Sequence, residues 1–145
     1  AMLDYLRTLN RASMPMFDSA STDVLLHRQL GEIAARLAAS RAYLLDTCRR
    51  LAAADESTDL RELFVEMLKV KVACTEAALD TSSRVHDLTG ARSTSNRFRL
   101  DRFWRNARTF ASHDSIDAKN ALIGFYELNR ELPDGSRYLP GVRGL

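Results

Sequence analysis

Apolar residues recur along two long stretches of the chain with the spacing of one helix face. Between residues 23 and 54 they step by three or four positions, at Leu26, Leu30, Ile33, Leu37, Ser40, Leu44, Cys48 and Leu51. Between residues 60 and 88 similar steps give Leu63, Met67, Val70, Cys74, Ala77, Thr81, Val85 and Leu88. Because this period is close to the ~3.6 residues of a helical turn, the sequence predicts two helices of about thirty residues each.

The segment between the two predicted helices is short and acidic. It runs from Asp55 to Asp59, and Asp59 stands three residues before Glu62, the spacing of a capping box. Helices joined by so few residues pack antiparallel, so we expect a helical hairpin. Small residues form a second face on the first helix, and they would let another helix backbone approach closely, which predicts self-association. They are Gly31, Ala34, Ala35, Ala38, Ala39 and Ala42.

Three shorter helices complete the pattern. We expect them at residues 3–12, 99–111 and 115–130, with Asp114 as N-cap of the last and Gly90 as left-handed C-cap of the second long helix. No stretch has the periodicity of a strand. The sequence therefore predicts an all-α fold, an up-down-up-down four-helix bundle. The bundle covers residues 20–131, after a short helix and linker at 1–19 and before an extended tail at 132–145.

Composition is that of a soluble protein with a single core. The 145 residues are 46% hydrophobic and 28% charged, and no apolar run approaches the roughly 20 residues that span a bilayer. No signal peptide is visible. These features predict a cytoplasmic protein without membrane contact. Cys48 and Cys74 are expected as reduced core residues, with a disulfide as the alternative.

The strongest local charge lies between Arg92 and Arg108. Six arginines stand there against one acid, whereas the whole chain carries a net charge of only +2. The run fits a solvated or ion-paired helix face, a site for a phosphate-bearing cofactor or an acidic neighbouring surface, or a nucleic-acid contact. The near-neutral total charge disfavours nucleic acid. Aromatic residues are interleaved with the arginines, at Phe98, Phe103, Trp104 and Phe110.

Few residues offer catalytic chemistry. None of the three histidines has a glutamate three residues before it, and no Cys-x-x-Cys pair is present, so no metal site is expected. Nucleophile elbows, P-loops and dinucleotide-binding glycine motifs are also absent. His27 and His86 fall within long helices and are expected at a surface or interface. His113 stands at the junction of two predicted helices and is the candidate for function.

The residues around His113 resemble the C-terminal helical domain of the acyl-CoA dehydrogenase superfamily. The similarity covers residues 20–131 and is closest to the type 2 domain of flavin-dependent monooxygenases, the branch that includes dibenzothiophene monooxygenase. It is carried by the run Asp101 to Thr109, by His113-Asp114, Lys119, Ile123-Gly124 and Leu128-Asn129, and by Gln29-Leu30-Gly31-Glu32 near the start.

This resemblance implies an organisation. Members have an N-terminal helical domain, a middle β-domain and a C-terminal four-helix bundle; the flavin lies between the β-domain and the bundle, and tetramers are usual. By this likeness the chain is the C-terminal domain of a flavin-dependent oxidoreductase. It would bind FAD or FMN only in the full-length context, self-associate as a dimer or tetramer, and depend on a flavin reductase in the monooxygenase branch. Alone, it is expected to be inactive.

The resemblance also implies site residues. His113 is implied as the catalytic residue, a proton donor or acceptor beside the flavin. The implied cofactor-binding residues are Gly90, Ala91, Ser93 and His113.

The choice between the monooxygenase branch and the dehydrogenases depends on where the chain carries glutamate. No glutamate lies between Glu76 and Glu127, where a dehydrogenase of this family would keep its base. The sequence therefore favours a reduced-flavin-dependent monooxygenase. An acyl-CoA dehydrogenase acting on the CH–CH group, and a non-catalytic oligomerisation domain or truncated relic, stay open as alternatives.

Overall fold

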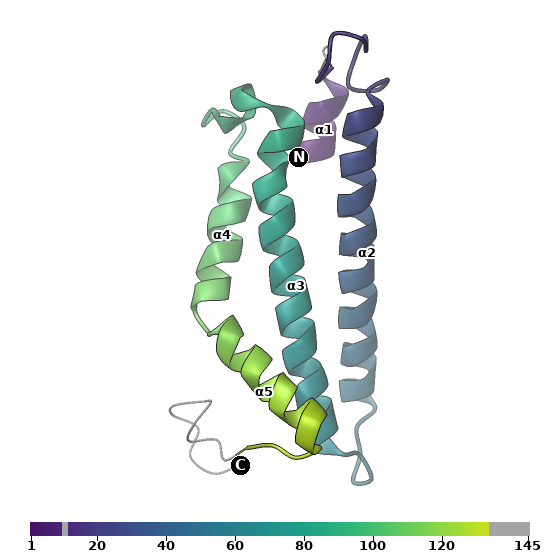
Figure 1. The fold of residues 1–145 in the computed structure, drawn as a ribbon, viewed down its shortest axis with the longest axis vertical. Coiled ribbons are helices and arrows are strands. Elements are labelled where there is room, and N and C mark those ends of the chain that lie inside the picture. The colour runs from purple at the N-terminus through teal and green to yellow at the C-terminus, as the bar shows by residue number, and fades with distance from the viewer. Residues whose placement is uncertain (10–11, 134–145) are drawn as a thin grey trace. The chain divides into compact units, whose positions relative to one another are not determined.

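The structure is a computed structural model that describes residues 1–9 and 12–133. Every regular element in this part of the chain is helical, which confirms the all-α fold. The elements are α1 (Met2–Arg7), α2 (Val24–Ala52), α3 (Leu60–Thr89), the 3₁₀ helix η1 (Ala91–Thr94), α4 (Asp101–Ser112) and α5 (Ile116–Asn129), coloured along the chain in Figure 1. The tail predicted at 132–145 lies almost wholly outside the described residues.

The chain divides into two compact units. The first comprises Ala1–Ala38 and Ala77–Thr109, and the second Ala39–Glu76 and Phe110–Leu145. The helices α2, α3 and α4 therefore contribute residues to both units. The up-down-up-down topology of the whole bundle stays a prediction.

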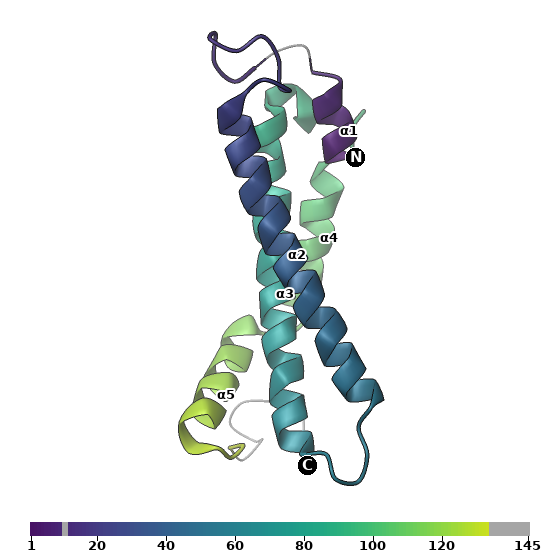
Figure 2. The ribbon, with the colours of Figure 1, turned by 90° about the vertical axis from the view of Figure 1, so that its right-hand side faces the viewer.

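An apolar cluster closes the first unit. Its buried members come from α1, the following linker, α2 and α3, and Figures 1 and 2 show α1 beside the start of α2 and the end of α3. Burial of this kind contributes about 25 cal/mol per Å² of apolar surface and is the main reason for the short α1 to dock. The cluster consists of Leu6, Ala20, Leu26, Ile33 and Leu88, with Met2 and Leu9 packed against it.

The carboxylate of Asp23 fastens the N-terminal segment to α2. Asp23 is fully buried, and one of its oxygens accepts the backbone N–H groups of Leu25 (3.0 Å) and Leu26 (3.1 Å), as an N-cap does. The other oxygen accepts from the backbone N–H of Ser13 at 2.7 Å and from the Ser13 hydroxyl. These bonds hold the pKa of the Asp23 carboxyl below its usual value, the Ser13 hydroxyl contributing most.

Polar pairs hold the second unit together. In Figures 1 and 2 the first half of α3 lies between α5 and the second half of α2. Tyr43 donates its hydroxyl to Glu66 at 2.7 Å, and the Lys69 ammonium lies 2.8 Å from Glu66 and 2.6 Å from Glu127. Helices α2, α3 and α5 are thus joined through one carboxylate–ammonium network. Buried apolar residues beside this network are Leu63, Val65, Leu68, Val70, Leu122 and Tyr126.

The face predicted as the core of α2 is only partly correct. Leu26 and Ile33 are buried as predicted. The remaining buried residue of α2 is Thr47, and its position fits a spacing of seven residues counted from Leu26. Polar residues seven apart run beside this line and bind acids on α3: Arg36 pairs with Asp80, Tyr43 with Glu66 and Arg50 with Glu62. They turn the predicted leucines outward, so Leu37, Leu44, Cys48 and Leu51 are exposed.

Helix ends were predicted closely, with three local differences. Helix α1 ends at Arg7 instead of residue 12, because the N–H groups of Thr8 and Leu9 bond three residues back and tighten the last turn. The N-cap of α5 is Ser115, whose hydroxyl accepts from the Ala118 N–H at 3.2 Å, and not Asp114. Gly90 has the expected positive φ of 73°, but its ψ of 174° is not left-handed helical.

Both cysteines were expected as reduced residues of the core. Cys48 and Cys74 are both free, but Cys48 is exposed, so its placement in a core was wrong. Met67 on the predicted apolar face of α3 is likewise 42% exposed. None of the helices that the structure describes combines the length and apolar character that crossing a membrane requires.

Candidate functional site

His113 lies in the two-residue bend between α4 and α5, in the second unit. Helix α4 ends at Ser112, and the Ser115 cap starts α5, so the chain has little freedom between them. His113 is exposed, and no hydrogen bond involves its ring within the described residues. The imidazole is therefore free to accept a proton from a group outside this chain or to donate one to it.

Lys119, Lys71 and His113 act on the neighbouring carboxylate of Asp114. The buried Lys119 forms an ion pair with it, and Lys119 Nζ also lies 3.5 Å from the Ser115 carbonyl oxygen. The hydrogen bond from Lys119 is the main reason that the pKa of the Asp114 carboxyl is lowered, and the charges of Lys71 and His113 act in the same direction. Asp114 thus stays ionised beside the His113 ring at neutral pH.

An exposed aromatic ring adjoins this turn. Phe110, near the end of α4, is 60% exposed, and Lys71 Nζ of α3 lies 3.8 Å from the centre of its ring. This cation–π contact holds the ring against the second unit. The turn consequently exposes an imidazole and an apolar ring next to the charged groups of Lys71 and Asp114.

The predicted cofactor loop follows α3 in the first unit. The Gly90 N–H donates to the His86 carbonyl at 2.8 Å, and the Ser93 hydroxyl donates to the Gly90 carbonyl at 2.7 Å. The Ser93 oxygen also lies 2.6 Å from the Thr89 hydroxyl and 3.1 Å from His86 Nδ1. Ser93 is fully buried, so it supports the loop from inside, whereas Ala91 is exposed.

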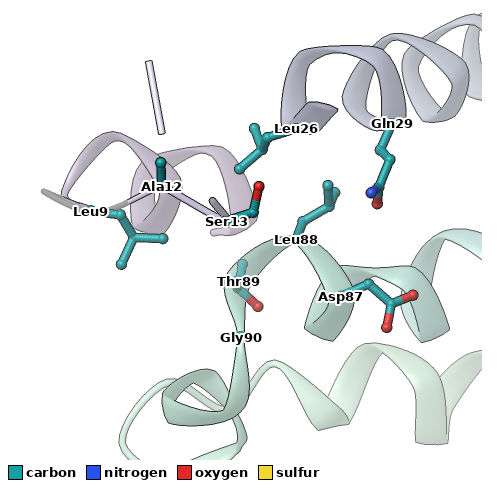
Figure 3. Close-up of a pocket in the computed structure, with 9 residues that line it drawn as sticks. All are labelled: Leu9, Ala12, Ser13, Leu26, Gln29, Asp87, Leu88, Thr89 and Gly90. Atoms are coloured by element: carbon teal, nitrogen blue, oxygen red, sulfur yellow. The ribbon is translucent and has the colours of Figure 1, made fainter. Parts of the chain in front are cut away.

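A small cavity opens beside Gly90. Figure 3 shows residues from the N-terminal segment, α2 and α3 around it, with Leu88 pointing from α3 toward α2. Its volume of about 210 Å³ is below the roughly 300–1,000 Å³ of typical cofactor sites. It does not enclose a flavin. Its lining consists of Leu9, Ala12, Ser13, Leu26, Gln29, Asp87, Leu88, Thr89 and Gly90.

Half of the arginine-rich run lies on α4, where Arg102, Arg105 and Arg108 are exposed. Within the first unit, Phe103 and Trp104 are 44% and 40% exposed, with arginine guanidinium groups above both rings. Of the arginines on α4, Arg105 forms an ion pair, with Asp101 at 2.9 Å. The ion-paired interpretation therefore applies to a part of the run only, and a docking surface or an anion contact stays open for the rest.

Sequence reasoning missed two residues of these sites. Lys119 is buried although lysine is rarely so, and its position five residues after Asp114 is a weak signal for an ion pair across a helix start. Asp23 was not singled out from the sequence, and one of its oxygens binds Ser13, ten residues earlier. No cluster of three metal-binding side chains occurs in the described residues.

These features define an all-α domain that presents an exposed histidine at the junction of two helices. A sequence model of the family described as acyl-CoA dehydrogenase, C-terminal domain, matches residues 1–118. The chain belongs to this family.

The proteins to which the chain is similar include monooxygenases. The chain is 39% identical over 140 residues to a dibenzothiophene monooxygenase of Rhodococcus erythropolis, and 32% identical over 138 residues to the probable FMNH2-dependent monooxygenase SfnC of Pseudomonas putida. These alignments cover 92% and 88% of the chain but 34% and 35% of the relatives. The FMN-bound TdsC of Paenibacillus sp. A11-2 superposes with a TM-score of 0.82 at 29% identity, over 91% of this chain and 35% of TdsC. The chain thus spans about a third of the relatives' length.

Proposed function

We propose that the chain is the C-terminal domain of a flavin-dependent monooxygenase and that it contributes to flavin binding and to oligomerisation. The observation that carries this proposal is the exposed His113 ring in a domain similar, over nearly its whole length, to that of an FMN-bound protein. The rest of the site would come from the two thirds of the relatives that this chain does not cover. Isolated, the chain would bind flavin weakly and have no activity.

FMN is the flavin that we propose. One relative is named FMNH2-dependent and one related structure is FMN-bound, whereas nothing in the described residues favours a dinucleotide. Reduced flavin supplies the electrons for oxygen insertion, so a separate flavin reductase would be the partner that provides it. The cytoplasm is the compartment that suits such a supply of reduced flavin.

The residues fit such a role in two places. Ala91 is exposed and Gly90 is partly exposed in a loop that Ser93 fixes from within, so we propose that Gly90 and Ala91 contact the flavin and that Ser93 maintains their conformation. His113 would exchange a proton with the flavin or substrate. Asp114, whose lowered pKa keeps it ionised, is the adjacent residue.

The dehydrogenase alternative lacks its chemistry in this chain. Abstraction of an α-proton requires a carboxylate base, and the residues near the turn offer Asp114, which is engaged by Lys119. An imidazole at position 113 suits acid–base chemistry on a flavin or phenol instead. A purely structural domain stays the rival, and it would not need His113.

Self-association is supported by the exposed side of α2 in the second unit. Leu44, Leu45 and Leu51 are 42%, 38% and 48% exposed on one helix, next to the exposed Cys48. Several large apolar side chains so close together favour a protein contact over solvent. We propose a second copy of the chain as the partner for this face.

A chimera tests the catalytic assignment. The matching third of the Rhodococcus erythropolis dibenzothiophene monooxygenase is replaced by this chain, and oxidation of dibenzothiophene is measured with FMN and a flavin reductase. We expect an active chimera in which His113→Asn lowers turnover by about 10²–10⁴-fold, since a general acid–base contributes that much. His27→Asn, a change of another exposed histidine, is the control and should leave turnover unchanged. A folded chimera that tolerates His113→Asn within a few fold contradicts the assignment.

A further inference from the structure

Lys119 is an unusual residue for its position. Its side chain is only 5% exposed, although burial of an ammonium group is costly and lysine is among the residues least often buried. It also lies in the first turn of α5, where the helix dipole disfavours positive charge. A leucine or methionine would suit this site better for stability alone.

The contacts of Lys119 point backward along the chain. From within α5 the ammonium reaches the carboxylate of Asp114 and lies 3.5 Å from the carbonyl oxygen of Ser115, the two residues that precede the helix. It therefore binds both a side chain and the backbone of the bend that carries His113. The ion pair is shielded from water at the lysine end, since the Asp114 side chain is 42% exposed and that of Lys119 is not.

The other groups around Asp114 act from different elements. Lys71 comes from α3 and holds the Phe110 ring, and His113 is the adjacent residue of the bend. Neither forms a hydrogen bond with Asp114 within the described residues, so among them Lys119 alone joins the carboxylate to a helix. All three lysines of the sequence, at 69, 71 and 119, lie in the second unit.

We infer that Lys119 is a positioning residue: through Asp114 and the Ser115 carbonyl it fixes the α4–α5 bend and so the direction in which His113 is presented. The structural part of this inference is independent of any activity. Its catalytic consequence rests on the proposed function, in which His113 must meet a flavin or substrate with defined geometry. Loss of Lys119 would then lower kcat and leave KM nearly unchanged.

The first measurement uses the chain by itself. Backbone dynamics of residues 112–116 are followed by heteronuclear NMR and amide exchange in Lys119→Met and Lys119→Gln. Methionine fills a similar volume without charge or donor, so the helix content and Tm should stay close to those of the unsubstituted chain. We expect amide exchange in the bend to rise about tenfold in Lys119→Met and less in Lys119→Gln, which keeps a donor. Lys69→Met is the matched control, because Lys69 pairs with Glu66 and Glu127 and not with the bend.

The second measurement uses the active chimera. With Lys119→Met, kcat should fall about tenfold with KM changed less than twofold, and Lys119→Gln should recover part of the loss. If exchange in the bend is the same in Lys119→Met as in the unsubstituted chain, the inference is overturned whatever the activity does. If exchange rises but turnover does not change, the structural inference stands and the role proposed for His113 fails.

Discussion

The two units stabilise themselves in different ways. The first unit closes around an apolar cluster, and its buried charge is the single carboxylate of Asp23, which accepts hydrogen bonds from its own chain. The second unit relies on ammonium–carboxylate pairs, with Lys69 between Glu66 and Glu127 and Lys119 on Asp114. Both units leave large apolar side chains of α2 exposed, among them Leu25 in the first unit and Leu44 in the second. The units therefore differ in how they hold buried charge: the first holds it in a capping carboxylate, and the second in an ion pair.

The largest expected effect comes from the apolar cluster. Ile33 is 2% exposed, and Ile33→Ala should lower the free energy of unfolding by about 3 kcal/mol, through lost burial and the cavity left behind. Leu44→Ala, on the same helix but 42% exposed, should cost less than about 0.5 kcal/mol in the monomer. Urea unfolding of both variants checks the comparison. Equal losses would mean that the two units do not differ in this way.

The exposed leucines should matter for assembly instead. Leu44→Lys together with Leu51→Lys places charge on the apolar face of α2 and should raise the dissociation constant of self-association at least tenfold, since about 1.4 kcal/mol suffices for that change. Light scattering and sedimentation at several concentrations measure it. The control is Leu25→Lys with Leu60→Lys, two exposed leucines away from this face. If the unsubstituted chain is already monomeric, a second copy of the chain is not the partner of this face.

The outcome for α2 explains how far the sequence was predictive. Helix positions, the all-α fold and the hairpin pattern follow from apolar periodicity, and they were predicted within a few residues. The buried face of the second half of α2 was not, because Arg36, Tyr43 and Arg50 meet acids on α3, and periodicity counts only apolar residues. A polar helix contact has no apolar signature, so its leucines were placed inside.

The candidate site also contains residues that the sequence could predict and residues that it could not. His113 could be selected from sequence because a helix junction is a local signal, whereas the Gly90 loop was implied by the resemblance to the family. The buried ion pair of Lys119 and the inward orientation of Ser93 depend on tertiary packing, for which residue type alone argues the opposite. The assignment of a role to these residues depends on groups that lie beyond the chain.

Acid should loosen the first unit through Asp23. Since the pKa of Asp23 is lowered in the folded chain, its contribution to stability is present above the unfolded value near 3.9 and is lost as pH falls through the folded pKa. Asparagine is also a good N-cap, so Asp23→Asn should lose about 5 °C less in Tm than the unsubstituted chain between pH 5 and 3. Asp18→Asn removes an exposed charge of the same linker and serves as control. Parallel acid profiles for all three proteins would show that Asp23 does not respond.

Alkali should act on the second unit, and Tyr43 is the group that reports it. Burial and the hydrogen bond to Glu66 raise the pKa of Tyr43 to about 12, against an ordinary value near 10. Because the folded pKa is the higher one, this contribution is complete below pH ~10 and is lost as pH rises toward 12. Absorbance at 295 nm should therefore show a late tyrosine step that is absent in Tyr43→Phe.

The same variant measures how much the hydrogen bond between Tyr43 and Glu66 contributes to stability. Tyr43→Phe removes the hydroxyl but leaves Glu66 its partner Lys69, so the carboxylate is not stranded. The loss should be about 1 kcal/mol at pH 7 and should vanish by pH 12, where the unsubstituted tyrosine is itself ionised. Tyr5→Phe is the control, since Tyr5 packs edge-on against Phe98 in the first unit. If every tyrosine of the helical chain titrates near pH 10, the hydroxyl of Tyr43 is not held by Glu66, and the polar network of the second unit is weaker than its geometry indicates.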